Sequence, residues 1–226
     1  GNIGGTTTIA GISSSIDDTA VAVFVYDTSK DSDGGAWRKR TTHTSWYNET
    51  LGTTTRGTRR EFPAVAVIVA ESSRVTIYDG DDPDLPLWIS FPTTNAKAVT
   101  ALNGELCLSC NDTSPAYHAL LRINFIADRA YNHRNTTNAT IQGFFLKTLS
   151  STDLQLIDNG SAYFSGYTSE VPNIISSNTN DVAMTLLPNA PVDDATGLPI
   201  PTIAVARSEE HTSELQSPMY LVCRLL

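Results

Sequence analysis

The chain has 226 residues, of which 40% are hydrophobic and 17% are charged, and its formal net charge is −9 at pH 7. This acidic balance argues against a general nucleic-acid-binding protein, which needs a basic surface. No apolar run approaches the roughly 18 residues that a membrane-spanning helix requires. The length allows one large domain or two small ones with a substantial core.

Strand patterns dominate the chain, and helical periodicity is nearly absent. Short runs of β-branched and aromatic residues, bounded by turn residues, predict strands at 20–26, 64–70, 74–78, 85–91, 98–102, 105–109, 120–126 and 202–206. Asn103 and Gly104 stand between two of these runs and are typical of the tight turn of a β-hairpin. We therefore expect an all-β protein.

A faint internal repeat indicates which kind of all-β fold to expect. Asp27 ends an apolar run and precedes an acidic, Gly-containing loop and then Trp37, and Asp79 and Trp88 repeat this order about fifty residues later. Residues 123–131 contain a third copy. A strand, an acidic turn and an aromatic strand at this period predict β-propeller-like antiparallel blades. The alternative is an irregular β-sandwich with two similar hairpins.

The chain divides into three segments. Residues 1–18 are an incomplete polar segment that opens on Gly rather than Met, and residues 19–206 carry the propeller-like domain. Residues 207–226 resemble the in-frame translation of a short-read sequencing adapter, so we expect them to be an artefact rather than a domain. The natural domain is then truncated at its C-terminal end, and the strand at 202–206 should lack its natural neighbour.

Two acidic loops are candidates for a calcium site. Calcium prefers several carboxylate and carbonyl oxygens on a tight turn that glycine relieves. The candidate ligands are Asp27, Asp31, Asp33, Asp79, Asp81 and Asp84. Neither loop has the full spacing of a helix-flanked calcium loop, and Asp and Gly also populate ordinary solvated turns. Calcium is the one cofactor that the sequence suggests.

The remaining reactive side chains do not form a catalytic motif. Cys107 and Cys110 have the spacing of a zinc knuckle or a redox pair, but the chain offers no second cysteine pair and no thioredoxin-like helix. We therefore expect small, partly buried thiols. No catalytic residue is assigned, and an enzymatic activity is unsupported by the sequence.

Four aromatic residues lie in segments rich in Ser and Thr, where a ring can stack on a sugar. They are Trp46, Tyr47, Tyr163 and Tyr167. Aromatic rings in such places also cover the edge of a core, so both interpretations stay open. Basic clusters at 37–40 and 56–60 indicate a contact with phosphates, a contact with an acidic neighbouring subunit, or a solvated strand end.

Three stretches of the chain resemble uncharacterised structural proteins of marine bacteriophages. They are residues 19–38 (TAVAVFVYDTSKDSDGGAWR), 43–50 (HTSWYNET) and 59–70 (RREFPAVAVIVA). Members of this group are long, repetitive β-proteins, some with propeller-like and lectin-like modules. The resemblance implies a tail-associated virion component and supplies no catalytic residues.

The leading hypothesis is therefore a phage virion structural protein with a role in assembly or in binding host-surface glycan. Its expected partners are other virion proteins, a cell-surface glycan and further copies of itself, with no nucleic acid and no membrane. Repeated weak sites on one particle would act together. One alternative is a carbohydrate-active enzyme, virion-associated or secreted, with a carboxylate pair across a cleft. Another is a propeller that serves as an interaction scaffold in a cell.

Overall fold

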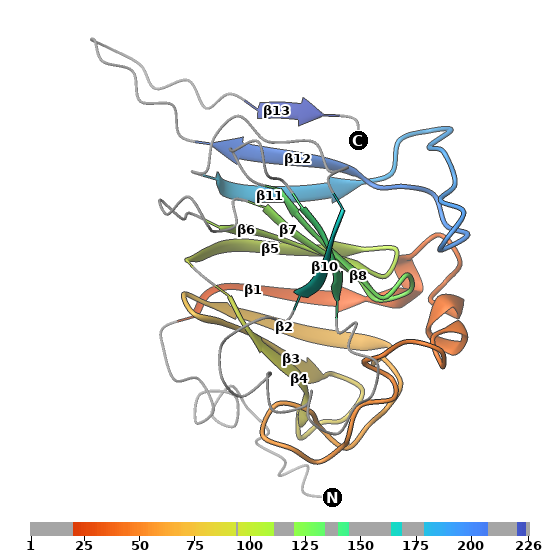
Figure 1. The fold of residues 1–226 in the computed structure, drawn as a ribbon, viewed down its shortest axis with the longest axis vertical. Helices are drawn as coiled ribbons and strands as arrows, with labels where there is room; N and C mark the ends of the chain where they lie inside the picture. The colour runs from red at the N-terminus through yellow and green to blue at the C-terminus, as the bar shows by residue number, and fades with distance from the viewer. Residues whose placement is uncertain are drawn as a thin grey trace, which may run out of the picture.

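A computed structural model describes residues 20–93, 95–110, 120–133, 140–144, 164–168, 179–207 and 221–224. These residues form three antiparallel sheets with almost no helix (Figure 1). In 140–144, 164–168 and 221–224 only the backbone is described. The prediction of an all-β fold is confirmed.

The first sheet is a four-stranded antiparallel meander. Its strands in order are β1 (Ala20–Asp27), β2 (Val65–Glu71), β3 (Arg74–Asp79) and β4 (Leu87–Pro92). Burial alternates along β1, because successive side chains of a strand point to opposite faces. Phe24 and Tyr26 face the core, and Val23 and Val25 face solvent. The connection from β1 to β2 contains two short 3-10 helices, η1 (Thr28–Lys30) and η2 (Ala36–Arg40).

The second sheet continues the meander through six strands. They are β5 (Ala96–Leu102), β6 (Glu105–Cys110), β7 (Leu120–Asn124), β8 (Arg129–His133), β9 (Thr140–Phe144) and β10 (Phe164–Thr168). The hairpin predicted at Asn103-Gly104 is confirmed: it joins β5 to β6, and both residues have positive φ, at 52° and 71°. Two consecutive left-handed residues match the twist of the flanking strands.

The third sheet has three strands. They are β11 (Thr179–Thr185), β12 (Thr202–Arg207) and β13 (Leu221–Arg224). β12 pairs with β11 on one side and with β13 on the other, so the expectation that residues 202–206 lack their natural neighbour stays a prediction. β13 lies within residues 207–226.

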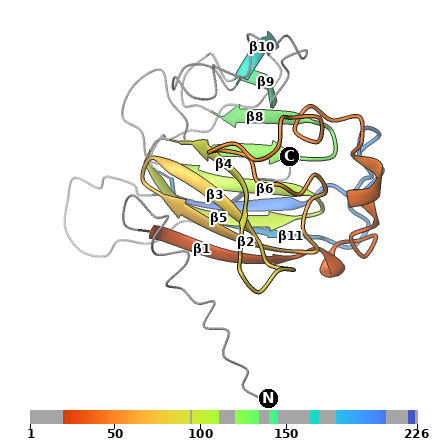
Figure 2. The ribbon, with the colours of Figure 1, turned by 90° about the horizontal axis from the view of Figure 1, so that it is seen from below.

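The first strand of each sheet lies beside the first strand of the next. β1, β5 and β11 are all edge strands, and β5 contacts β1 on one side and β11 on the other. Viewed from below, β1, β5 and β11 lie toward one edge of the molecule and β4 and β8 lie away from it (Figure 2). The sheets therefore stack in chain order.

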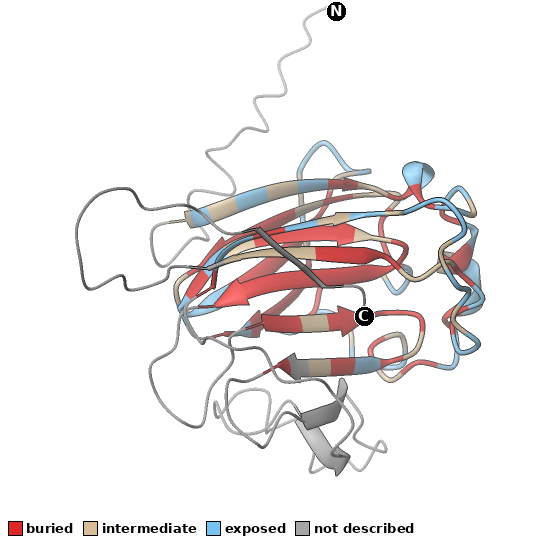
Figure 3. Cartoon of the chain, turned by 90° about the horizontal axis from the view of Figure 1, so that it is seen from above, coloured by how far each residue is buried: buried red, intermediate tan, exposed pale blue. Residues whose placement is uncertain are grey.

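Two apolar layers hold the stack together, and Figure 3 marks the buried residues along the strands. The larger layer lies between the first and second sheets and includes Phe24, Val99 and Ala101. The smaller lies between the second and third sheets and includes Ala98 and Val182. β5 contributes to both layers because its successive side chains alternate between the two faces of its sheet.

An aromatic cluster closes one end of the larger layer. Phe62 packs against Trp88 with ring centroids 4.7 Å apart, and Trp46 packs against Trp88 at 5.4 Å, both edge to face. Phe125 of the second sheet lies 5.0 Å from Phe62. Trp46 Nε1 donates to the Phe125 carbonyl, so a buried polar group is satisfied where the two sheets meet. The connection between η2 and β2 thus belongs to the core.

The fifty-residue repeat does not coincide with the sheets. Asp27 ends β1 and Asp79 ends β3, so the first two copies lie in a single sheet. Trp37 lies in η2, whereas Trp88 lies in a strand, so these residues are not equivalent in structure. The described sheets therefore do not follow this period, and blades of about fifty residues are not shown. The described sheets also do not close into a ring.

Gly57 is a position where the fold admits no side chain. Its backbone N–H donates to the Trp88 carbonyl, and a Cβ built on Gly57 would lie 1.7 Å from the Leu87 carbonyl oxygen. We expect Gly57→Ala to lower the free energy of unfolding by about 3 kcal/mol, because the loop must move off β4. Urea unfolding followed by tryptophan fluorescence measures this.

Gly34→Ala is the matched control. Gly34 has a φ of +65° and open space around it, so alanine there meets backbone strain only. Its cost should be about 1 kcal/mol. Equal losses in the two variants would contradict the steric argument for Gly57.

Candidate functional site

Three connections meet at one end of the stack and form the most extensive polar network among the described residues. They are residues 28–41 of the first sheet, the Asn103-Gly104 turn of the second, and residues 186–201 before β12. In Figure 1 the orange and blue connections at the right show this end. We define this set of segments as the loop end.

Asp31 organises the loop end. Its Oδ2 accepts from Tyr26 Oη at 2.5 Å and from Trp37 Nε1 at 2.7 Å, and its Oδ1 accepts from the Asn103 backbone N–H at 2.7 Å. Tyr26 Oη in turn accepts from the Gly104 N–H. Burial raises the pKa of Asp31 above its ordinary value, although the hydrogen bonds from Tyr26 and Trp37 oppose this. One carboxylate therefore binds three donors from two sheets.

Asn103 carries the network to the third sheet. Its Oδ1 accepts from the Ser32 N–H and hydroxyl, and its Nδ2 donates to the Pro199 carbonyl at 2.8 Å. Arg40 adds a second link by donating to the Thr196 carbonyl at 3.2 Å. The connections of all three sheets are thus cross-linked by buried or half-buried polar groups.

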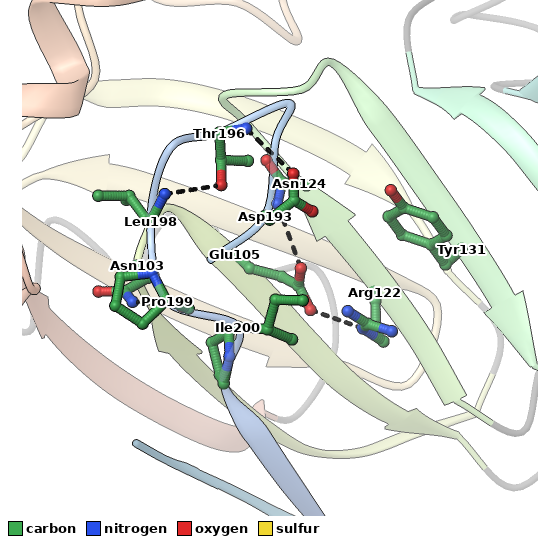
Figure 4. Close-up of a pocket in the computed structure, with 11 residues that line it drawn as sticks. Asn103, Glu105, Arg122, Asn124, Tyr131, Asp193, Thr196, Leu198, Pro199 and Ile200 are labelled. Atoms are coloured by element: carbon green, nitrogen blue, oxygen red, sulfur yellow. Dashed lines mark hydrogen bonds and ion pairs between the residues drawn. The ribbon is translucent and has the colours of Figure 1, made fainter. Parts of the chain in front are cut away.

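A small pocket lies beside this network, between the second sheet and residues 193–201 (Figure 4). Glu105 accepts from Arg122 Nε at 2.6 Å and from Asn124 Nδ2 at 3.2 Å, and the Arg122 guanidinium lies 5.0 Å from the Tyr131 ring centroid. Burial alone would lower the pKa of Arg122, but Glu105 raises it above its ordinary value. The open volume is about 30 Å³, enough for about one or two waters and too small for a sugar ring.

A second buried ion pair lies in the connection between η2 and β2. Arg56 is 2% exposed and its Nε is 3.6 Å from Glu49 Oε2, while its other nitrogens donate to the carbonyls of Trp88 and Arg60. Burial raises the pKa of Glu49 to about 7, Arg56 lowers it, and the charge of Asp128 adds to the rise. Glu49 is therefore a carboxyl that titrates near neutral pH.

The six predicted calcium ligands lie in two separate regions of the chain. Five of them form hydrogen bonds or ion pairs with other groups of the protein. Asp27 accepts from Ser29, Asp31 forms the network above, and Asp33 accepts from Gly35 and Arg40. Asp79 and Asp81 share Arg59, whose Nη1 lies 2.8 Å and 2.7 Å from their oxygens, and Asp84 lies exposed on the following turn. Within the described ranges, no group of three or more His, Cys, Asp or Glu side chains is placed to hold a metal. The calcium site stays a prediction.

The predicted sugar-stacking aromatics also have different surroundings. Trp46 is 0% exposed and packs in the aromatic cluster, so its ring offers no face to a ligand in this structure. Tyr47 is half-buried at the edge of that cluster and keeps part of its surface in solvent. Tyr163 lies outside the described residues, and Tyr167 lies in β10, where only the backbone is described.

Cys107 and Cys110 are buried thiols that form no disulfide. Burial raises the pKa of the Cys107 thiol far above its ordinary value, which leaves it unreactive. The buried pairs Glu105–Arg122 and Glu49–Arg56 were not predicted from the sequence. A charged residue inside an apolar run, as at Arg122, is the only local signal that indicates the first pair.

Comparison with protein-family models, with curated proteins and with solved structures finds no match to this chain. In the part of the chain that the structure describes, no helix has the length and apolar character needed to cross a membrane.

Asp31→Asn tests the network at the loop end. The amide places a donor opposite the donors of Tyr26, Trp37 or Asn103, so a buried hydrogen bond is lost and donors face each other. We expect the free energy of unfolding to fall by about 2–4 kcal/mol. The control is Asp33→Asn, the same chemical change at a half-buried ion pair, which should cost less than about 1 kcal/mol. Equal effects would show that Asp31 has no special role.

Glu49 should make stability depend on pH. Its pKa is raised from 4.5 to about 7 in the folded protein, so between these values the folded state binds more protons than the unfolded state. Stability therefore falls as pH rises from about 4.5 to 7, by about 2–3 kcal/mol, and is constant above this range.

The variant Glu49→Gln removes this titration and should flatten the pH profile of the unfolding free energy. Glu61→Gln, at an exposed glutamate, should keep the wild-type slope. Urea unfolding at a series of pH values measures both. A profile for Glu49→Gln as steep as that of wild type would contradict the assignment.

Proposed function

We propose that this chain is a tail-associated structural protein of a bacteriophage virion, in which stacked propeller-like blades present loops for assembly and for binding host-surface glycan. The observation that carries the proposal is the side-by-side packing of β1, β5 and β11, the first strands of three successive sheets. This arrangement is typical of neighbouring blades around a central axis. The sequence resemblance to phage structural proteins supports the location.

The packing of the faces supports the blade interpretation. Each sheet is an antiparallel meander in chain order, and the first and second sheets each bury one face against the sheet that follows in the chain. A single sheet of this kind cannot bury both faces, so stacking supplies its core. Blades in this interpretation begin at Ala20, Ala96 and Thr179.

The loop end supplies a rigid surface. Asp31 and Asn103 join the connections of the three sheets, so these loops do not move independently. Loops held on a strand scaffold can vary in sequence while the core persists, which suits a protein that must adapt to changing surfaces.

Tyr47 is the best described candidate for a sugar contact. It is half-buried, and Thr42, His43 and Asn48 are exposed nearby in the chain. Asn48 Nδ2 donates to the carbonyls of Thr42 and Thr44, which fixes the shape of this segment. An anchored aromatic ring beside hydroxyl and amide groups can stack on a sugar and bind its hydroxyls. Many copies on one particle would compensate for weak single sites.

A carbohydrate-active enzyme is the second candidate, and Glu49 favours it. A general acid in glycoside hydrolysis needs a carboxyl that is protonated near neutral pH, and Glu49 has a pKa of about 7 with Asp128 as a second carboxylate close enough to raise it. Both carboxyls are buried, at 6% and 8% exposure. Hydrolysis would therefore require the connection between η2 and β2 to open.

The test displays the chain on streptavidin beads and incubates it with bacterial capsular and lipopolysaccharide glycans. We expect retention of a subset of glycans without release of reducing ends. Tyr47→Ala should lower retention about five- to thirtyfold, as expected for one lost stacking contact of about 1–2 kcal/mol per site. Tyr131→Ala, at a half-buried tyrosine in the pocket, should bind as wild type.

If the chain releases reducing ends from a glycan and the Glu49→Gln variant does not, the carbohydrate-active enzyme is favoured instead. No retention of any glycan would remove the binding role and leave assembly. Mass spectrometry of purified virions tests whether the protein is a virion component. Absence of the chain's peptides from these particles would contradict the virion assignment.

A further inference from the structure

The outer face of β1 is an apolar strip that the described structure leaves in solvent. Val21, Val23 and Val25 are 43%, 60% and 59% exposed, and they lie on one face because they alternate along the strand. Val65 and Val67 of the neighbouring strand β2 are half-buried on the same face, and Val67 pairs with Val25. We call Val21, Val23 and Val25 the valine face. In Figure 3 this strand lies at the upper edge, where exposed and intermediate residues alternate.

The two interfaces inside the chain show what such a face packs against. In the second sheet Val99 belongs to the layer shared with Ala22 and Phe24 of β1. In the third sheet Val182 belongs to the layer shared with Ala98 of β5. In both cases a valine of a first strand belongs to the same apolar layer as an alanine of the first strand that precedes it in the chain.

At the opposite end of the stack, the outer face of the third sheet carries exposed and half-buried alanine residues. Ala183 is exposed on β11, where it pairs with Ala204 of β12, and Asp181 of β11 pairs with Ala206. Ala204 and Ala206 are half-buried. We call Ala183, Ala204 and Ala206 the alanine face. In the first strand of the second sheet, Ala98 packs against the apolar cluster that contains Val182.

We propose that the valine face of one copy docks on the alanine face of a second copy, head to tail, and so continues the stack of sheets. The contact repeats the interfaces between β1 and β5 and between β5 and β11. Branched side chains then meet small ones, which allows the two sheets to approach closely.

The contact is heterologous, so it joins different surfaces of the two copies. Two copies together supply six sheets, within the four to eight blades of known propellers, so a closed dimer satisfies both faces of both copies. The net charge of −9 opposes association, and salt should therefore strengthen it. This inference depends on the blade arrangement proposed above and is independent of glycan binding.

The test is the molar mass of the full chain, measured by light scattering after size exclusion over about a hundredfold range of concentration. We expect a mass of two chains that dissociates on dilution. Val23→Lys should weaken association at least about tenfold, because a lysine replaces a side chain that the contact buries. Val192→Lys is the matched control, since Val192 is 59% exposed in a connecting loop and outside both faces.

A second variant separates the head-to-tail contact from a symmetric one. Ala183→Lys should also prevent association, and mixing it with Val23→Lys should restore a dimer, because each variant keeps the face that the other has lost. Circular dichroism confirms that the variants are folded. A wild-type chain that stays monomeric, or an Ala183→Lys variant that associates as wild type, would overturn the proposal. Glycan retention by a monomeric chain would show that only this inference fails.

Discussion

A single buried carboxylate sets the arrangement of the sheets at the loop end. Asp31 is 5% exposed, and its position is fixed by donors from β1, from η2 and from the turn after β5. A charged group is costly to bury, and only several hydrogen bonds offset that cost. Because the donors belong to two sheets, the carboxylate is satisfied only when those sheets stand in one relative position. Asn103 extends the same condition to the third sheet.

The apolar layers specify the stack less strictly than this network. The alternation of small and branched residues along β1, β5 and β11 determines which face of each sheet is buried. Apolar packing alone, however, tolerates some sliding of one sheet over another. The hydrogen bonds at the loop end and the hydrogen bond from Trp46 Nε1 to the Phe125 carbonyl prevent this sliding. The same alternation leaves the valine face of β1 in solvent, so stacking within the chain and docking between copies follow from one pattern.

Local chemistry explains which parts of the fold the sequence predicts. The strands around Val23, Ile68 and Leu108 consist of β-branched and apolar residues, and the Asn103-Gly104 turn needs only its own two residues. β8 and β11 escape prediction because RAYNH and TNDVAMT have polar residues at most positions and become strands through pairing with β7 and β12. β-propensity reflects such neighbours more than the backbone itself.

The candidate site depends still more on contacts between distant residues. Asp31 and Asp27 look alike in the sequence, yet one binds a turn 72 positions away and the other caps its own loop. Trp46 and Tyr47 are adjacent, yet one ring fills the core and the other reaches solvent. Burial at these positions is decided by the path of the connection between η2 and β2, which no local pattern encodes. Asp31, Trp46 and Arg56 therefore hold the scaffold, whereas Tyr47 beside Trp46 keeps part of its surface in solvent.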